Sequence, residues 1–348
     1  MKGNRMSTNS QNENPGDIVT VSIVGCGLMG ERHFTSCLQL PGVKISSVID
    51  PRVEKAQALA GGSDAKVFSD VSHALSTEPP DAVVVATPPG FRRKVVEQVV
   101  STGSGVFVEK PIALDMESVR AMCRAIDQTP VVNSAGFHLR YSPLAREAQG
   151  LIAGRKVDHV RSVTTTSYYL AQDVPIWYLQ RRHSGGPLLE QSIHMIDMAR
   201  FLVGDISKIS AIGRKKQQPG LPNADSEDSM VLSFRFKNGA LGSHIDSCSM
   251  AEFNWEVQMF GEDWRLQVDF ARNRLSGWFE GQSVEKDLSK GDYHLLEMEA
   301  FVNAVRQRRQ DEILSSFYDA GVTLSTVLAA RNSLDADGEW HDVSDGVN

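Results

Sequence analysis

Cysteines are few in this sequence, and none has the spacing of a metal site. The four cysteines of the 348-residue chain, Cys26, Cys37, Cys123 and Cys248, are scattered, and no two form a C-x-x-C pair. Disulfide frameworks and zinc sites both require closer and more regular spacings. We therefore expect no metal site, and a reducing compartment, the cytoplasm.

Long apolar runs and an excess of positive charge are also lacking. No apolar run approaches the ~20 residues that a membrane-spanning helix needs. The net charge of −7 disfavours nucleic acid or an anionic membrane as the main partner. The polar N-terminus has no apolar signal-peptide segment, and we predict a disordered tail over residues 1–16. The length favours two domains with sizeable cores.

The first half of the sequence repeats a strand, a turn and a helix. Apolar runs at 18–25, 44–50, 81–87 and 105–110 are typical of strands that are buried on both faces. Helical segments between them imply βαβ crossovers and a parallel sheet. We predict an α/β fold class with a Rossmann dinucleotide-binding domain at residues 17–136.

A glycine-rich turn follows the first predicted strand. Gly25, Gly27 and Gly30 have the spacing G-x-G-x-x-G, which permits a tight turn, a close approach to a pyrophosphate and close packing of the next helix. Asp50 lies twenty residues after Gly30, where a carboxylate can bind a ribose 2′-hydroxyl. Its charge favours NAD, whereas Arg52 would neutralise a 2′-phosphate or lie along the adenine. The sequence predicts NAD, with NADP as the alternative.

Three further segments follow the later predicted strands, and a fourth lies in a predicted helix. They are ATPPGF at 86–91, EKP at 109–111, GFHLRYSP at 136–143 and GGPLLEQSIHMID at 185–197. With the glycine turn, these segments in this order make the chain, from about residue 18 to 343, similar to the glucose–fructose oxidoreductase / inositol dehydrogenase / MocA family. The departures are Arg92, where members often have histidine, and Glu190, where most have aspartate.

Lys110 and one helical face carry the predicted chemistry. A lysine at the ligand edge of a parallel sheet can stabilise charge on a reacting oxygen. Glu190, His194 and Asp197 have the spacing i, i+4, i+7, so they share one face of a continuous α-helix. Acids beside a histidine can orient it and raise its basicity. The family resemblance implies that Lys110, His194 and Glu190 are catalytic and that Asp197 supports the histidine or binds a substrate hydroxyl.

The remaining site predictions concern ligand contacts. Substrate-binding candidates are Asp197, Arg140, Tyr141, Trp177 and Arg182, although Arg140 is as well suited to an interdomain salt bridge, and Trp177 to packing of its own loop. The expected cofactor-binding residues are Gly25, Gly27, Leu28, Met29, Gly30, Asp50, Arg52, Thr87, Pro88, Pro89, Glu109 and Lys110.

Alternating apolar and polar runs dominate the rest of the chain, residues 137–348. They predict a largely antiparallel sheet with one covered face in an α+β domain. The resemblance implies that this domain binds substrate and forms a homodimer or homotetramer through the sheet. It also implies an NAD(P)-dependent oxidoreductase acting on a secondary alcohol of a sugar, sugar derivative or inositol. Two alternatives in the same family stay open: an NAD-dependent glycosidase and a non-catalytic dinucleotide-binding regulator.

Overall fold

A computed structural model describes residues 18–348 except 168–174, 216–222, 290, 345 and 348. The predicted tail at 1–16 lies outside the described residues. In the described part of the chain, no helix is both long and apolar enough to cross a membrane.

The first sheet is parallel throughout and has the strand order β3-β2-β1-β4-β5-β6. This is the doubly wound order that binds dinucleotides at the carboxyl ends of its strands. Its strands are β1 (Val19–Val24), β2 (Val43–Ile49), β3 (Lys66–Phe68), β4 (Ala82–Val85), β5 (Gly105–Val108) and β6 (Asn133–Ala135).

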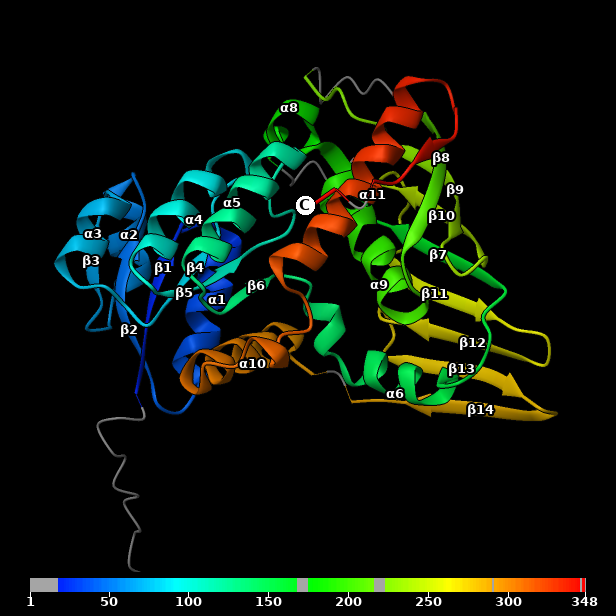
Figure 1. Ribbon diagram of the computed structural model, residues 1–348, viewed down its shortest axis with the longest axis horizontal. Coiled ribbons are helices and arrows are strands. Elements are labelled where there is room, and N and C mark those ends of the chain that lie inside the picture. Colours follow the sequence, from blue (N-terminus) through cyan, green and yellow to red (C-terminus); the bar gives the residue numbers. More distant parts are fainter. Residues whose placement is uncertain (1–17, 168–174, 216–222, 290, 345, 348) are drawn as a thin grey trace, which may run out of the picture.

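Helices cover both faces of this sheet, as the uninterrupted apolar strands require. In β4, Val83 and Val85 face one core while Ala82 and Val84 face the other, because side chains alternate along a strand. Its helices are α1 (Leu28–Gln39), α2 (Val53–Ala60), α3 (Val71–Thr77), α4 (Arg92–Ser101) and α5 (Met116–Gln128). Figure 1 shows this layered unit on the left.

The second sheet has nine strands in the order β14-β13-β12-β11-β7-β10-β9-β8-β15. All neighbours are antiparallel except β7 and β10. The predicted α/β class and mostly antiparallel second sheet are thus confirmed. The strands are β7 (His159–Thr165), β8 (Ile206–Arg214), β9 (Ser229–Phe236), β10 (Leu241–Ser247), β11 (Asn254–Phe260), β12 (Trp264–Asp269), β13 (Arg274–Phe279), β14 (Gln282–Asp287) and β15 (His341–Asp342).

In the described part of the chain, helices cover one face of the second sheet and leave the other without helices (Figure 1). They are α6 (Pro143–Ile152), α9 (Ile193–Val203) and α11 (Phe317–Asp335), with the short α8 (Arg181–Ser184) nearby. On the other face, Ile212, Val231, Leu241, Ile245 and Trp278 are exposed. An apolar face of this kind is typical of an interaction surface.

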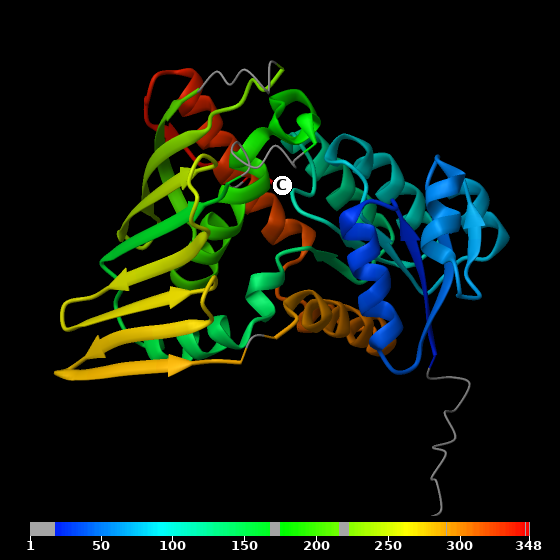
Figure 2. The same ribbon diagram turned by 180° about the vertical axis from the view of Figure 1, so that it is seen from behind.

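The helix α10 (Tyr293–Gln307) departs from the predicted division of the chain. The boundary predicted at residue 136 falls directly after β6, but α10 packs beside α1 on the first sheet, as Figure 2 shows from behind. Met298, Phe301 and Val302 of α10 share a core with β1. The apolar face of α10 is therefore buried in the nucleotide-binding unit, although it follows the second sheet in sequence.

Candidate active site

The glycine turn joins β1 to α1 at the carboxyl edge of the first sheet. Gly25 has φ +97°, and a Cβ there would come 2.8 Å from the Ala86 carbonyl oxygen. A Cβ on Gly30 would come 1.9 Å from the Gly25 oxygen, whereas one on Gly27 would meet no atom within 4 Å. The open space beside Gly27, at the uncapped N-terminus of α1, fits a pyrophosphate.

Asp50 follows β2 and turns its carboxylate toward this turn. The carboxylate accepts hydrogen bonds from the backbone N–H groups of Cys26 and Arg52, both at 2.9 Å. Burial opposes its ionisation, but these N–H groups and the Arg52 guanidinium outweigh burial and lower the pKa of Asp50. The ionised carboxylate keeps lone pairs for ribose hydroxyls, and the Arg52 side chain is largely exposed.

Arg92, at the start of α4, ties together the loops that follow β4 and β5. Its Nε donates to the Thr87 carbonyl oxygen at 2.8 Å, and its Nη1 donates to the carbonyl oxygens of Glu109 and Pro111. Arg92 is buried, and burial lowers the pKa of its guanidinium to about 10. The residue that departs from the family pattern therefore fixes the two loops predicted to meet the cofactor.

The other cofactor-binding candidates lie around these loops. Leu28 is exposed and Met29 half-buried at the start of α1. The Thr87 hydroxyl is buried without a hydrogen-bond partner in the described part of the chain, which leaves it free for a ligand. Pro88 is exposed, and Pro89 starts a short 3-10 helix.

Glu109 and Lys110 directly follow β5, and their side chains contact different partners. The Glu109 Oε1 lies 2.6 Å from the His33 Nε2, and both side chains are buried. Burial opposes ionisation of Glu109, but His33 and Lys110 lower its pKa to about 2. The Lys110 Nζ donates to the backbone oxygen and to Oε2 of Glu190, both at 2.9 Å. The sequence predicted that Glu190 would orient His194, whereas in the structure it contacts Lys110.

A π-helical turn explains this difference. Leu188–Ser192 form a π turn directly before α9, so the predicted helix is continuous α-helix only from residue 193. A π turn holds more residues than an α turn, which rotates Glu190 out of the i, i+4 alignment with His194. Gly185 and Gly186, with φ of +88° and +71°, precede the turn, and a Cβ on either would collide with Leu189 or Ser226.

His194 lies in a nearly closed aromatic environment. Its ring is 4.9 Å from Trp255 and 5.1 Å from His138, and only 4% of the residue is exposed. Its Nδ1 has no hydrogen-bond partner among the described residues. Burial, with the nearby Lys110 ammonium, holds the pKa of His194 well below its usual 6.5. The imidazole is therefore neutral at pH 7, which is the form that accepts a proton, but its basicity is lowered and not raised as the acidic neighbours in the sequence suggested.

Asp197 and Arg140 form a buried ion pair with each other. The Arg140 Nε and Nη2 donate to the two carboxylate oxygens of Asp197 at 2.8 and 2.6 Å, and Asp197 also accepts from the Thr323 hydroxyl at 2.8 Å. Arg140 further pairs with Asp319. The Tyr141 hydroxyl accepts from the Leu314 N–H at 3.1 Å. These contacts favour a salt bridge for Arg140 over binding of substrate hydroxyls, but both partners lie within the predicted second domain, so the salt bridge is not the interdomain one that was expected.

Trp177 and Arg182 lie on the short helical segments before the π turn. Trp177 is exposed, with its ring 5.9 Å from that of Tyr178. Arg182 is exposed on α8, which packs near the 3-10 helix that begins at Pro89. The aromatic contact to His194 comes instead from Trp255 of β11.

Sequence reasoning missed the residues that surround His194 from distant segments. Trp255 lies on β11 and His294 on α10, and His33 lies one turn after the glycine motif. His138 was part of a recognised segment but received no role. No local spacing could have found Trp255 or His294, because only tertiary packing brings them close to His194.

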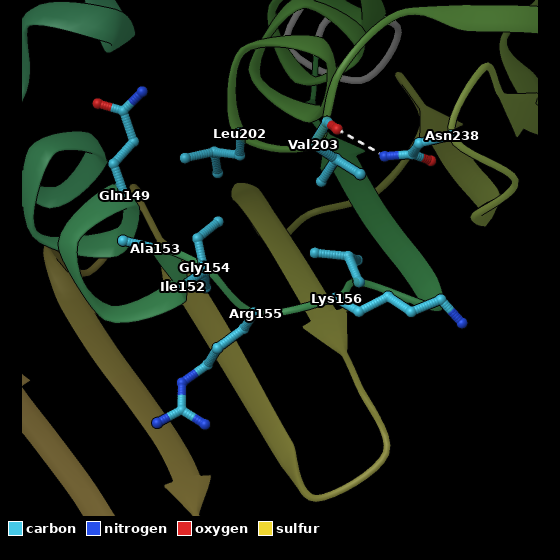
Figure 3. Close-up of a pocket in the computed structure, with 10 residues that line it drawn as sticks. Gln149, Ile152, Ala153, Gly154, Arg155, Lys156, Leu202, Val203 and Asn238 are labelled. Atoms are coloured by element: carbon cyan, nitrogen blue, oxygen red, sulfur yellow. Dashed lines mark hydrogen bonds between the residues drawn. The ribbon is translucent and has the colours of Figure 1, made fainter.

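A pocket of about 330 Å³ lies elsewhere, between the C-terminal ends of α6 and α9. In Figure 3, Leu202 and Val203 line it beside Asn238, whose side chain donates to the Val203 oxygen at 2.9 Å. Leu202 is eight residues from His194 along α9, about 12 Å of helix. Neither the nucleotide-binding loops nor Lys110 line this pocket, so we do not place the reaction there.

Comparisons with known proteins identify the family of the chain. Residues 19–137 match the model described as "Oxidoreductase family, NAD-binding Rossmann fold", and residues 145–268 match "GFO/IDH/MocA C-terminal domain". The chain belongs to the Gfo/Idh/MocA oxidoreductase family. It is therefore an NAD-dependent oxidoreductase of CH–OH groups, as the sequence predicted.

Several relatives match nearly the whole chain. A scyllo-inositol 2-dehydrogenase (NAD(+)) of Bacillus subtilis is 24% identical over 90% of this chain and 94% of the relative. A D-glucoside 3-dehydrogenase of Escherichia coli is 27% identical over 89% of this chain and 93% of the relative. A levoglucosan dehydrogenase solved with NADH has a TM-score of 0.83 at 21% identity, covering 94% and 99% of the chains, and shares the fold.

Proposed function

We propose that this oxidoreductase oxidises a secondary alcohol of a sugar, sugar derivative or inositol. The observation that carries the proposal is the meeting of Lys110, from the nucleotide-binding sheet, with the π turn and α9 that hold Glu190 and His194. A cationic donor and a neutral base thus lie close enough to interact electrostatically, beside the cofactor loops. The relatives named for inositol and glucoside oxidation support this substrate class.

Each side chain has one task in the proposed reaction. Neutral His194 accepts the hydroxyl proton, and the Lys110 ammonium donates a hydrogen bond to the same oxygen. Two of the three ammonium protons are directed to Glu190, so the third is free for the substrate oxygen. NAD would be held by the Gly27 region, Asp50 and Thr87, and when bound it supplies the acceptor for the carbinol hydride.

A panel assay tests this proposal. Purified protein is incubated with NAD and with scyllo-inositol, myo-inositol, methyl glucoside, levoglucosan, sugar phosphates or nucleotide sugars, and reduced nicotinamide is followed by absorbance. Reduction with at least one polyol is expected. Binding of NADH without turnover of any of them would favour the regulator alternative. Net hydrolysis of a glycoside without accumulation of NADH would favour the glycosidase.

The exposed face of the second sheet carries the assembly proposal. We propose that a second copy of the chain covers the exposed apolar residues of β8, β9, β10 and β13 in a homodimer or homotetramer. Light scattering at micromolar concentration is expected to give twice or four times the 38.2 kDa chain mass. A monomer would reject this proposal, and Val231→Glu should shift an oligomer toward the monomer.

A further inference from the structure

Four of the chain's nine histidines gather beside the proposed reaction centre. His33 comes from α1, His138 from the 3-10 helix that follows β6, His194 from α9 and His294 from α10. Among the described residues, no group of three or more histidine, cysteine or acidic side chains could hold a metal ion. The gathering therefore calls for a different chemical explanation.

Three of these rings form a row that leads outward from His194. The ring centroids of His194 and His138 are 5.1 Å apart at 71°, and those of His138 and His294 are 4.0 Å apart at 29°. Exposure rises along the row: His194 is 4% exposed, His138 is 9% exposed and His294 is half-buried. The row thus joins a closed base to the protein surface.

The proposed function requires such a connection, and this inference rests on it. Each oxidation breaks the substrate O–H bond and leaves the proton on His194, while the electron pair of the carbinol C–H bond leaves as hydride to the cofactor. The buried His194 must lose that proton before the next turnover. A neutral imidazole has one donor and one acceptor nitrogen, so it can take up a proton at one side and release it at the other.

Burial and neighbouring charges keep the rings of the row neutral. Burial, with His294, His194, Lys110 and His33, lowers the pKa of His138 well below 6.5. Burial also lowers the pKa of His294 to about 4, with His33 and Arg32 opposing and Glu109 and Asp292 favouring the cation. Each ring is therefore neutral at pH 7, and no proton is trapped on the row. At the inner end Lys110 lowers and Glu109 raises the pKa of His194, and at the outer end Arg32 and its ion-pair partner Asp292 act in opposite directions on His294.

We propose that His138 and His294 carry the hydroxyl proton from His194 to solvent. The proton passes from His194 to His138, then to His294 and finally to water or a buffer base, which leaves all three imidazoles neutral. Stacked rings do not hydrogen-bond face to face, so the second transfer requires one ring to rotate about its side-chain bonds. The Nδ1 atoms of His194 and His294 have no partner among the described residues, so no hydrogen bond at these atoms opposes rotation.

Phenylalanine variants test the relay while keeping the ring contacts. The variants are His138→Phe and His294→Phe, and His73→Phe is the control because this exposed histidine also makes a ring contact, with Phe68 at 5.4 Å. We expect kcat in weak buffer at pH 7 to fall about 10- to 100-fold in both relay variants, less than on removal of the base itself. NADH affinity should be unchanged in both relay variants, and the control variant should keep the kcat of the wild type.

Chemical rescue separates proton transfer from a structural role. Added imidazole should restore kcat in His294→Phe, whose solvent side is open, and should leave the wild type unchanged. Unchanged kcat in both relay variants, or a loss that imidazole does not restore in His294→Phe, overturns the relay. A wild-type protein that oxidises no member of the panel rejects the proposed function instead.

A measurement on the protein without substrate tests the row independently of activity. Nuclear magnetic resonance titration of the ring nitrogens should show a higher pKa for His138 in His294→Phe, because one repelling neighbour is removed. An unchanged pKa of His138 would show that the two rings do not interact and would overturn the relay.

Discussion

Replacement of Asp197 by asparagine tests whether this residue holds the fold or binds the substrate. The Arg140 and Asp197 side chains are only 3% and 2% exposed, and Asp197 accepts two hydrogen bonds from Arg140 and one from Thr323. Asp197→Asn removes the negative charge and leaves the buried guanidinium short of one partner. We therefore expect Asp197→Asn to lower stability and to leave the substrate KM unchanged.

The expected loss follows from the remaining partners of Arg140. Breaking a buried ion pair by removing one partner costs about 3–5 kcal/mol. Asp319 still contacts Arg140 in the variant and is partly solvated, so we expect about 3 kcal/mol, the lower end of that range. For a cooperative unit of 150–250 residues this lowers Tm by about 6–12 °C.

Thermal unfolding followed by circular dichroism, with kinetics at 20 °C, measures both effects. The double variant Arg140→Met, Asp197→Leu should be more stable than Asp197→Asn, because it leaves no unpaired buried charge. An unchanged Tm combined with a KM raised tenfold or more would refute this reasoning and assign Asp197 to the substrate.

Three further predictions concern other parts of the site and the fold. His194→Ala and Lys110→Ala should each lower kcat about 10²–10⁴-fold. Because both side chains act on one oxygen, the double variant should lose much less activity than the two single losses multiplied together, and strictly multiplicative losses would contradict this. Asp50→Ala should weaken NADH binding and reduce the ratio of NADH affinity to NADPH affinity, both measured by fluorescence titration. Unchanged NADH binding would exclude a contact between Asp50 and the ribose. Burial raises the pKa of Asp246 to about 7, so the fold holds this proton more tightly than the unfolded chain, and stability falls as pH rises from about 4 to 7. Asp246→Asn should therefore raise Tm at pH 8 but not at pH 4. Equal changes in Tm at both pH values would contradict the raised pKa of Asp246.

The first half of the fold was predictable because its signals are local. Alternation of strand and helix, the glycine turn, and proline or glycine at helix ends are read within a few residues. The positive φ of Gly25 and the close approach of Gly30 to the Gly25 oxygen are both local to the turn, and Asp50 contacts the turn from the adjacent strand end. The family segments added Lys110 and His194, which no local rule would have paired.

The features that sequence reasoning missed depend on contacts between distant segments. Nothing in the pattern of α10 shows that it returns to the first sheet, because an apolar helical face fits either sheet. The π turn at 188–192 is also invisible to a 3.6-residue period, and it changed the partner of Glu190. The same packing brings His294 onto His138, which no spacing in the sequence indicates.

Glu190→Asp tests the reason for the glutamate where most family members have aspartate. In the structure the side chain reaches Lys110 at 2.9 Å from the π turn. Aspartate is shorter by one methylene, about 1.5 Å, so its carboxylate would lose the direct hydrogen bond to the ammonium. The backbone contact would remain, and Lys110 would lose one of the two bonds that aim its third proton at the substrate. We expect kcat to fall about tenfold with NADH affinity unchanged, whereas Glu190→Gln, which keeps the length but not the charge, should lose less. Full activity of Glu190→Asp would show that this distance does not matter and that Glu190 does not position Lys110.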